Sequence, residues 1–245
     1  MWLSTRDRGI EKIIFQANDF KHGLLVSETL NKSDNEIRGI FSDRNQRLWI
    51  ASKSGNLYVY DQGKKVDNIF VNRPAGSLGL VYNMIQGRDG TIWLGTKGNG
   101  LYKAIPNDKR GLTYTLTHYK AEKKDVNSLS SDLIYSVLED AKGRIWVATY
   151  QYGINLLVQD GEKVKFANIR NSFKNYPVGS WKARHLAQDA NGKIWVATTN
   201  GLVIFDPDKG SPDDYTFKSY GKVPGDKNSL GNNDAQYIYR DSKDR

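Results

Sequence analysis

The stretch Arg144-Ile145-Trp146-Val147-Ala148-Thr149 decides the fold of this chain, because the chain repeats it. Its near-copies are Arg47-Leu48-Trp49-Ile50-Ala51-Ser52, Thr91-Ile92-Trp93-Leu94-Gly95-Thr96 and Lys193-Ile194-Trp195-Val196-Ala197-Thr198. The tryptophans of these four copies are separated by 44, 53 and 49 residues. A shorter copy, Trp2-Leu3-Ser4-Thr5, lies 47 residues before Trp49. Self-similarity at a period of this size is the signature of a repeat protein.

Each complete copy has the same flanking segments. An apolar segment that ends in Asp comes first, as in Ile134 to Asp140, and a short turn joins it to the Trp segment. A glycine and a further apolar segment follow, as in Gly153 to Leu157, and then a more variable fourth segment such as Tyr114 to Tyr119. Four antiparallel strands per repeat describe one blade of a β-propeller. A helical repeat would need apolar residues at i, i+3 and i+4 over ten or more positions, and the sequence has no such stretch.

The sequence therefore predicts an all-β fold, a β-propeller of four-stranded antiparallel blades, with about five blades' worth of strands. The predicted ranges are strands two to four of a blade in 1–30, whole blades in 31–73, 74–120, 121–176 and 177–222, and the first strand of the next or closing blade in 223–245. Two arrangements stay open. The last strand could close a five-bladed ring and remove the exposed edges, or the chain could be part of a larger, seven-bladed propeller. We expect the second, because the chain begins in mid-blade without a signal peptide.

The repeated Trp and Asp are expected to have structural roles. On the second strand, Trp can fill the space between adjacent blades and bury roughly 150–250 Å² of aromatic surface. The Asp before each turn is expected to form hydrogen bonds in that turn and to take no part in catalysis.

Composition excludes several classes of function. The chain has no cysteine, which excludes disulfides, thiolate metal sites and Cys catalysis. Its net charge is +9, but the 36 basic residues are scattered among 27 acidic ones, so we expect no nucleic-acid partner. No apolar run approaches the ~20 residues that span a bilayer, so we expect no membrane contact by this segment. Its three histidines lack the spacing of metal ligands, and we expect no metal or cofactor.

The pattern Asp-x-x-Gly-x-Ile-Trp-(Val/Leu)-(Ala/Gly)-Thr, followed by Gly-Leu, resembles the two-component regulator propeller repeat. A second mark of the resemblance is an Asn-Ser-Leu element before the first strand, in Asp125–Ser130 and Asp226–Leu230, with a degenerate form in Ala75–Leu78. The resemblance covers nearly the whole chain. It implies the periplasmic sensor domain of hybrid two-component system histidine kinases of Bacteroidetes, many of which respond to oligosaccharides. The immunoglobulin-like module, membrane span and kinase that follow such propellers are not in this sequence, so kinase activity is not assigned to it.

A ligand is expected on the blade face where two kinds of loop meet: those joining strands two and three, and those joining strand four to the next blade. These loops combine aromatic rings with Arg, Lys and Asn, which suits sugar recognition, since ring faces stack on aromatics and hydroxyls or carboxylates take directional donors. The predicted ligand-binding residues are Arg8, Lys53, Lys97, Asn99, Tyr150, Gln151, Tyr152, Trp181, Arg184 and His185. The alternatives are that Trp181 packs its own loop, that Tyr150 and Tyr152 are surface tyrosines, and that His185 is a buried, hydrogen-bonded residue.

The resemblance and these residues together predict a periplasmic, ligand-sensing propeller that binds an oligosaccharide, an acidic one included, with homodimerisation through the full-length sensor left open. A protein-interaction scaffold is the alternative, and a propeller glycosidase or lyase is a further one. A glycosidase needs two inward carboxylates about 5–10 Å apart. The inner-strand positions offer mostly Ile, Val, Tyr, Asn and Ser, with Glu36 and Asp132 near the strand starts. We therefore expect that this chain is not an enzyme.

Overall fold

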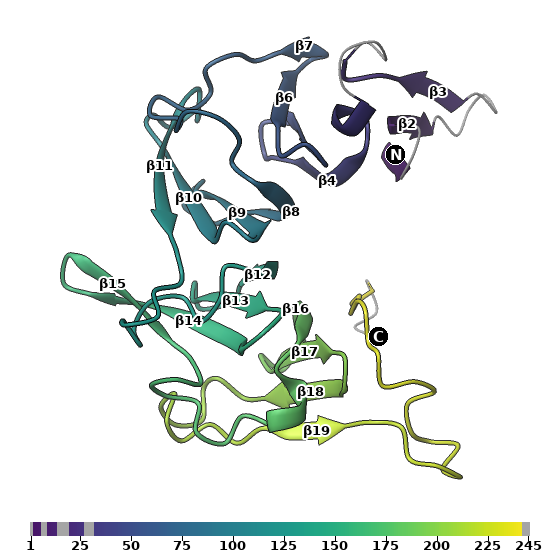
Figure 1. Cartoon of the computed structure of the whole chain (residues 1–245), viewed down its shortest axis with the longest axis vertical. Coiled ribbons are helices and arrows are strands. Elements are labelled where there is room, and N and C mark those ends of the chain that lie inside the picture. Colours follow the sequence, from purple (N-terminus) through teal and green to yellow (C-terminus); the bar gives the residue numbers. More distant parts are fainter. Residues whose placement is uncertain (1, 6–8, 14–19, 27–31, 242–245) are drawn as a thin grey trace. The chain divides into compact units, whose positions relative to one another are not determined.

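The computed structural model describes residues 2–5, 9–13, 20–26 and 32–241, and the side chains from residue 23 onward. Within this part of the chain the strands form five antiparallel sheets, one of three strands and four of four strands (Figure 1). In each four-stranded sheet the strands follow one another in chain order, as they do in a propeller blade. The predicted all-β fold of four-stranded blades is confirmed.

The five sheets follow the repeat along the chain. The first sheet holds β1 (Trp2–Thr5), β2 (Gly9–Ile13) and β3 (Phe20–Gly23). The second holds β4 (Ile37–Ser42), β5 (Leu48–Ser52), β6 (Leu57–Asp61) and β7 (Lys64–Lys65), and the third β8 (Leu80–Gln86), β9 (Ile92–Lys97), β10 (Leu101–Pro106) and β11 (Tyr114–Tyr119). The fourth holds β12 (Ile134–Glu139), β13 (Ile145–Thr149), β14 (Gly153–Asp160) and β15 (Lys163–Ala167), and the fifth β16 (Ala183–Gln188), β17 (Ile194–Thr198), β18 (Gly201–Phe205) and β19 (Lys218–Tyr220). Two single-turn 3₁₀ helices, Lys32–Asp34 and Val178–Ser180, lead into β4 and β16.

The chain divides into two compact units, Met1–His118 and Tyr119–Arg245. Within each unit the first strands of neighbouring blades lie side by side: β4 lies beside β8 in the first unit, and β12 beside β16 in the second (Figure 1). The first strand of each blade therefore faces the same strand of its neighbour, which is the arrangement of a propeller's inner strands.

The repeated Asp organises the hairpin between the first two strands of each blade. In the fourth sheet, Asp140 Oδ1 accepts hydrogen bonds from the backbone N–H groups of Lys142 (2.9 Å) and Arg144 (3.0 Å). Its Oδ2 accepts from Arg144 Nε (2.5 Å) and from Trp146 Nε1 (2.9 Å). The same Trp Nε1 contact, also 2.9 Å, is made to Asp43 by Trp49 and to Asp189 by Trp195. One carboxylate thus closes the turn, as the repeat pattern predicted, and it also fixes the indole, which the sequence did not predict.

The arginine of the repeat joins one blade to the next. Arg47, in the second sheet, donates from Nη1 to the Gly111 carbonyl and from Nη2 to the Tyr114 hydroxyl (2.8 Å), both in the third sheet. In the other unit, Arg144 donates from Nη1 to the Pro207 carbonyl of the fifth sheet (2.8 Å). The Arg47 side chain is 4% exposed and its partner Asp43 is fully buried. An arginine therefore fastens two blades together in each unit, and the Arg47 side chain is buried whereas that of Arg144 is 24% exposed.

The repeated Trp packs between blades, as the sequence predicted. Trp49 is fully buried and meets the Tyr114 ring of the next blade edge-on, with centroids 5.8 Å apart. Trp146, also fully buried, meets Phe205 of the next blade in the same way at 5.2 Å. Trp195 is only half-buried, because the far side of its blade lines a cavity of about 890 Å³. Aromatic packing between blades thus accounts for the recurrence of Trp.

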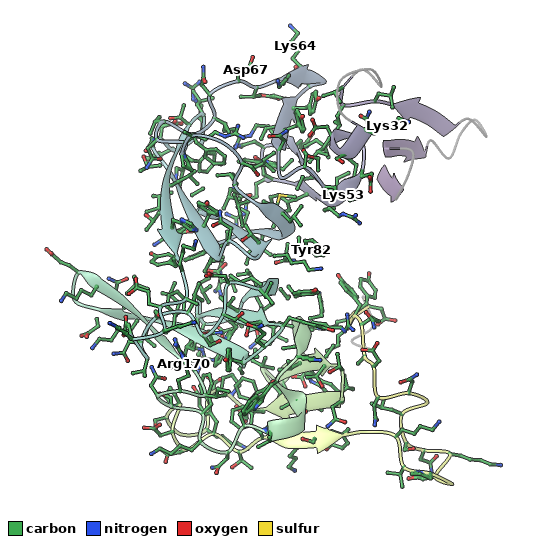
Figure 2. All side chains as sticks on the ribbon, in the orientation of Figure 1. Lys32, Lys53, Lys64, Asp67, Tyr82 and Arg170 are labelled. Atoms are coloured by element: carbon green, nitrogen blue, oxygen red, sulfur yellow. The ribbon has the colours of Figure 1, made fainter. Side chains whose placement is uncertain are left out.

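The Asn-Ser-Leu element forms a compact loop that is held by hydrogen bonds to its serine hydroxyl. Ser128 Oγ accepts from the Glu122 N–H (2.8 Å) and donates to the Asp125 carbonyl (2.8 Å). Arg170, beside the β14–β15 hairpin in Figure 2, donates from Nη2 to the Ser128 and Leu129 carbonyls, each at 2.8 Å. The second copy repeats the local fold, since Ser229 Oγ accepts from the Val223 N–H (2.9 Å) and donates to the Asp226 carbonyl (2.8 Å).

The C-terminal segment, residues 232–241, occupies the position of a further first strand beside β16. The Gly201 N–H donates to the Asn233 carbonyl (2.6 Å), as the Gly153 N–H does to the Trp181 carbonyl (2.7 Å) one blade earlier. The Ala235 N–H donates to the Thr198 carbonyl (3.0 Å). The predicted strand in 223–245 is not formed in the described residues 223–241, because a strand needs a ladder of partner hydrogen bonds and this segment makes only scattered ones.

The Asp-centred turn gives a stability prediction. Replacing Asp43 by Ala leaves the buried Arg47 guanidinium and the Trp49 Nε1 without their acceptor, so the free energy of unfolding should fall by about 3 kcal/mol. Denaturant unfolding followed by tryptophan fluorescence measures the loss. The control is Asp67→Ala, at a side chain that is 75% exposed (Figure 2) and should change stability by less than about 0.5 kcal/mol. Equal effects of the two substitutions would contradict the structural role of Asp43.

Candidate functional site

The first strand of each of the four complete blades carries a bulge at the same position. The pairing of β4 with β5, of β8 with β9, of β12 with β13 and of β16 with β17 skips one residue near the strand start. The skipped residues are Arg38, Tyr82, Tyr135 and Arg184. A bulge turns its side chain away from the regular alternation of the strand. The fold thus presents one side chain per blade at the loop end of the inner strand, opposite the Asp-centred turn.

The residue that leaves the second strand lies next to this bulge. The Tyr150 N–H donates to the Leu133 carbonyl (2.9 Å), and the Thr199 N–H donates to the Lys182 carbonyl (3.2 Å). In the first unit the Lys53 N–H makes the same bond to the Glu36 carbonyl (2.7 Å). Each blade therefore pairs a bulge residue with an exit residue, and the side chains at these two positions form the candidate ligand-binding face.

In the second unit this face carries a cluster of aromatic rings and cations. Tyr150 stacks on Tyr135 with centroids 4.8 Å apart and planes inclined by 20°. Arg184 Cζ lies 5.2 Å and Lys182 Nζ 5.7 Å from the Tyr150 ring centroid, both within cation–π range. Arg184 Nη2 also lies 3.4 Å from the Tyr150 hydroxyl. Two positive charges are thus held against one phenol ring.

A second aromatic pair follows directly in the same loops. The rings of Tyr152 and Trp181 lie 6.2 Å apart, inclined by 37°, and the two residues are 38% and 37% exposed. Gly153 allows this arrangement, because its φ of 68° favours glycine and an added Cβ would lie 2.7 Å from the Tyr176 ring. Gln151, between the two tyrosines, accepts a hydrogen bond from Ser131 Oγ (3.0 Å). Tyr152 and Trp181 form the exposed aromatic surface of the site.

His185 lies behind the cluster on β16. Its ring lies against Tyr237 with centroids 3.8 Å apart, and its Nδ1 is 3.4 Å from the Ile238 N–H, which donates to it. Burial disfavours the charged imidazolium and lowers the pKa of His185 to about 4. Near neutral pH this histidine is an uncharged acceptor for the C-terminal segment.

The predicted residues of the first unit make local contacts. Lys53 Nζ pairs with Glu36 Oε2 (2.8 Å), and Lys97 Nζ lies 5.4 Å from the centroid of the Tyr82 ring; Figure 2 labels Lys53 and Tyr82. Asn99 Nδ2 donates to the Leu78 carbonyl (3.0 Å) and the Tyr102 hydroxyl (2.8 Å). This amide therefore joins the β9–β10 loop to the segment before β8 and to β10. The Lys97 and Tyr82 pair occupies the exit and bulge positions that Tyr150 and Tyr135 occupy in the second unit.

The structure groups the predicted residues by unit. It brings together Tyr150, Gln151, Tyr152, Trp181, Arg184 and His185 in the second unit, places Lys53, Lys97 and Asn99 in the first, and Arg8 lies outside the described residues. Sequence reasoning missed Tyr135, Lys182 and Asp234. Aligning the first strands would have identified them, because Lys182-Ala183-Arg184 and Asp234-Ala235-Gln236 occupy the same place in successive repeats.

Two further observations bear on the kind of site. In the part of the chain that the structure describes, no three His, Asp or Glu side chains gather in a way that could hold a metal ion. The same part contains no helix with the length and hydropathy needed to cross a bilayer.

Comparison with known proteins identifies the repeat. Residues 128–151, which cover β12, the Asp140 turn and β13, match the family model "Two component regulator propeller". The chain is also 30% identical over 86 residues to histidine kinase P4 of Formosa agariphila, an alignment that covers 34% of this chain and 6% of the kinase. The chain thus carries the two-component regulator propeller repeat, and it matches only a small part of the length of that kinase.

Solved structures share the fold. The extracellular domain of a putative hybrid two component system from B. thetaiotaomicron aligns with a TM-score of 0.70 and 20% identity, over 99% of this chain and 29% of that one. Virginiamycin B lyase from Staphylococcus aureus aligns with a TM-score of 0.61 and 12% identity, over 91% of this chain and 67% of the lyase. At these identities the likeness establishes the propeller fold alone.

The His185 environment predicts a pH dependence of stability. The unfolded chain takes up a proton on this histidine near pH 6.5, whereas the folded chain does so only near pH 4. The contribution of His185 to the free energy of unfolding is therefore complete above pH 6.5 and is lost as the pH falls towards 4. Denaturant unfolding at pH 7.5, 6 and 5 should show a smaller loss for His185→Gln than for the wild type. Parallel losses in the two proteins would contradict the burial of a neutral imidazole.

Proposed function

We propose that this chain is the ligand-sensing propeller of an extracytoplasmic sensor in a two-component system. We propose further that it binds an oligosaccharide on the candidate ligand-binding face of its second unit, where the bulge and exit residues lie. The observation that carries the proposal is the exposed pair Tyr152 and Trp181 beside the Arg184 and Lys182 cations. Aromatic surface next to directional donors is the chemistry that recognises sugars.

The geometry supports a ligand that contains at least two linked sugar rings. Trp181 and Arg184 are three positions apart in the chain, so their Cα atoms lie at most about 11 Å from one another. A sugar stacked on Tyr152 and Trp181 therefore places the next unit of the same oligosaccharide within reach of Arg184 and Lys182. Tyr150 positions both cations and is not a stacking surface for the sugar, because Tyr135 stacks on its ring and the two cations lie over that ring as well.

The comparisons support the sensing role and the location. The matched repeat is named for two-component regulators, and the curated relative is a histidine kinase. The structural neighbour is an extracellular domain of a putative hybrid two component system. We extend both properties to this chain as the proposal, with signalling carried out by a kinase module outside this sequence.

We assign no catalytic role to this site. The likeness to virginiamycin B lyase rests on the propeller fold at 12% identity. The cations of the second unit are engaged with aromatic rings and with Asp234, and this arrangement serves recognition of a ligand.

The aromatic pair gives a binding prediction. Isothermal titration with a panel of neutral and acidic oligosaccharides should identify a sugar class that binds, and that class should also raise the thermal midpoint of the chain. Trp181→Ala and Tyr152→Ala should each weaken its binding about tenfold, because each removes one stacking surface.

Tyr220→Ala is the control, since Tyr220 is a 51%-exposed tyrosine on β19, the strand farthest from β16 in the fifth sheet. It should leave the affinity unchanged. A cooperative fold that binds no sugar in this panel would contradict the proposed function and favour a protein-interaction scaffold.

A further inference from the structure

Arg184 is incompletely satisfied in its site. Its Nη2 contacts both Asp234 Oδ1 (3.1 Å) and the Tyr150 hydroxyl (3.4 Å). Its Nε is buried and has no hydrogen-bond partner among the described residues. A guanidinium binds a carboxylate best through two parallel N–H groups. Asp234 approaches only one nitrogen, so Arg184 keeps unused capacity for an anion.

Asp234 is a partly exposed partner of Arg184, and its Oδ2 also accepts a hydrogen bond from Gln236 Nε2 (2.7 Å). Its side chain is 45% exposed, whereas that of Arg184 is 20% exposed. It lies on the segment 232–241, whose contacts with β16 include two long ones of 3.4 Å, from the Ile238 N–H to His185 Nδ1 and from Arg240 Nη1 to the Gln188 carbonyl. Tyr237 and Tyr239 of the segment are 68% and 76% exposed. An exposed ion pair on such a segment contributes little to stability, so a competing anion can replace Asp234.

The position of Asp234 explains why it meets Arg184. In successive repeats Asp234 takes the place of Lys182, immediately before the first strand. Lys182 lies over Tyr150, the exit residue of the blade before it, whereas Asp234 contacts Arg184, the bulge residue of the blade before it. The fold therefore puts a carboxylate against Arg184.

We propose that Arg184, with Lys182, is the subsite for the acidic group of an oligosaccharide, and that Asp234 occupies this subsite until the ligand carboxylate or sulfate displaces it. The inference rests on the proposed function and specifies its ligand as an anionic sugar. Displacement removes one of the contacts between segment 232–241 and the blade, so ligand binding and the position of this segment are coupled.

The first test compares matched ligands on the full chain. The probes are tetragalacturonate, its methyl ester, which keeps the rings and removes the charge, and a sulfated galactose tetrasaccharide, which separates sulfate from carboxylate. Asp234→Asn should raise the affinity for the acidic probe at least about fivefold at low salt, because the internal competitor is lost. Arg184→Gln should abolish this preference, so that tetragalacturonate binds no more tightly than its methyl ester.

Asp213→Asn is the matched control, because it removes one negative charge from an exposed loop away from Arg184. It should change the affinity for tetragalacturonate less than twofold. An Asp234→Asn variant that binds both acidic probes no better than Asp213→Asn would overturn the inference.

The second test follows the segment itself. Adding tetragalacturonate, or replacing Asp234 by Asn without ligand, should speed hydrogen exchange at the Ala235 N–H, which donates to the Thr198 carbonyl. Binding with unchanged exchange would overturn the displacement. Binding of the methyl ester alone, in the wild type and in Asp234→Asn, would reject the anionic subsite and leave the proposed function standing. Failure of all probes with both proteins would reject both.

Discussion

The carboxylate at the end of each first strand is the contact on which the blades depend. One oxygen accepts the backbone N–H groups of the hairpin turn, and at Asp43, Asp140 and Asp189 the other accepts the indole N–H of the Trp two residues beyond the turn. At Asp89 the second oxygen accepts from the Thr91 hydroxyl instead. The turn therefore fixes the rotamer of the Trp that fills the space between blades. Arg47 and Arg144 extend the same contact to the next blade, whereas Thr91 and Lys193 stand at this position in the second complete blade of each unit.

Because the Asp-centred turn is rigid, the opposite end of each blade is free to vary. The bulge position holds Arg38, Tyr82, Tyr135 and Arg184 in successive blades, and each of these lies beside the residue that leaves the second strand. A constant backbone thus offers different side chains at equivalent places. In the second unit these side chains are Tyr135, Tyr150 and Arg184, with Lys182 added from the loop before β16.

The segment after β19 contacts the candidate ligand-binding face of the second unit through Asp234 and Arg184. It repeats the local fold of the Asn-Ser-Leu loop and then runs beside β16, where its contacts include the neutral His185 ring and Arg184. A sensor needs a part whose position depends on the ligand, and weakly held segments provide it at low energetic cost. The contact between Arg184 and Asp234 connects such a segment to the binding face.

The sequence alone determined the four-stranded blade, the inter-blade role of Trp49 and Trp146, and the turn role of the repeated Asp, since a period of 44 to 53 residues with fixed flanks admits few other folds. It also singled out Tyr150, Tyr152 and Trp181 as candidates, because these residues depart from the repeat. Only the tertiary structure decided which side chains meet: the bulges that present Tyr135 and Arg184 are shifts in strand register, and register depends on pairing between strands. The contact of Asp234 with Arg184 likewise joins residues 50 positions apart, which no local pattern encodes.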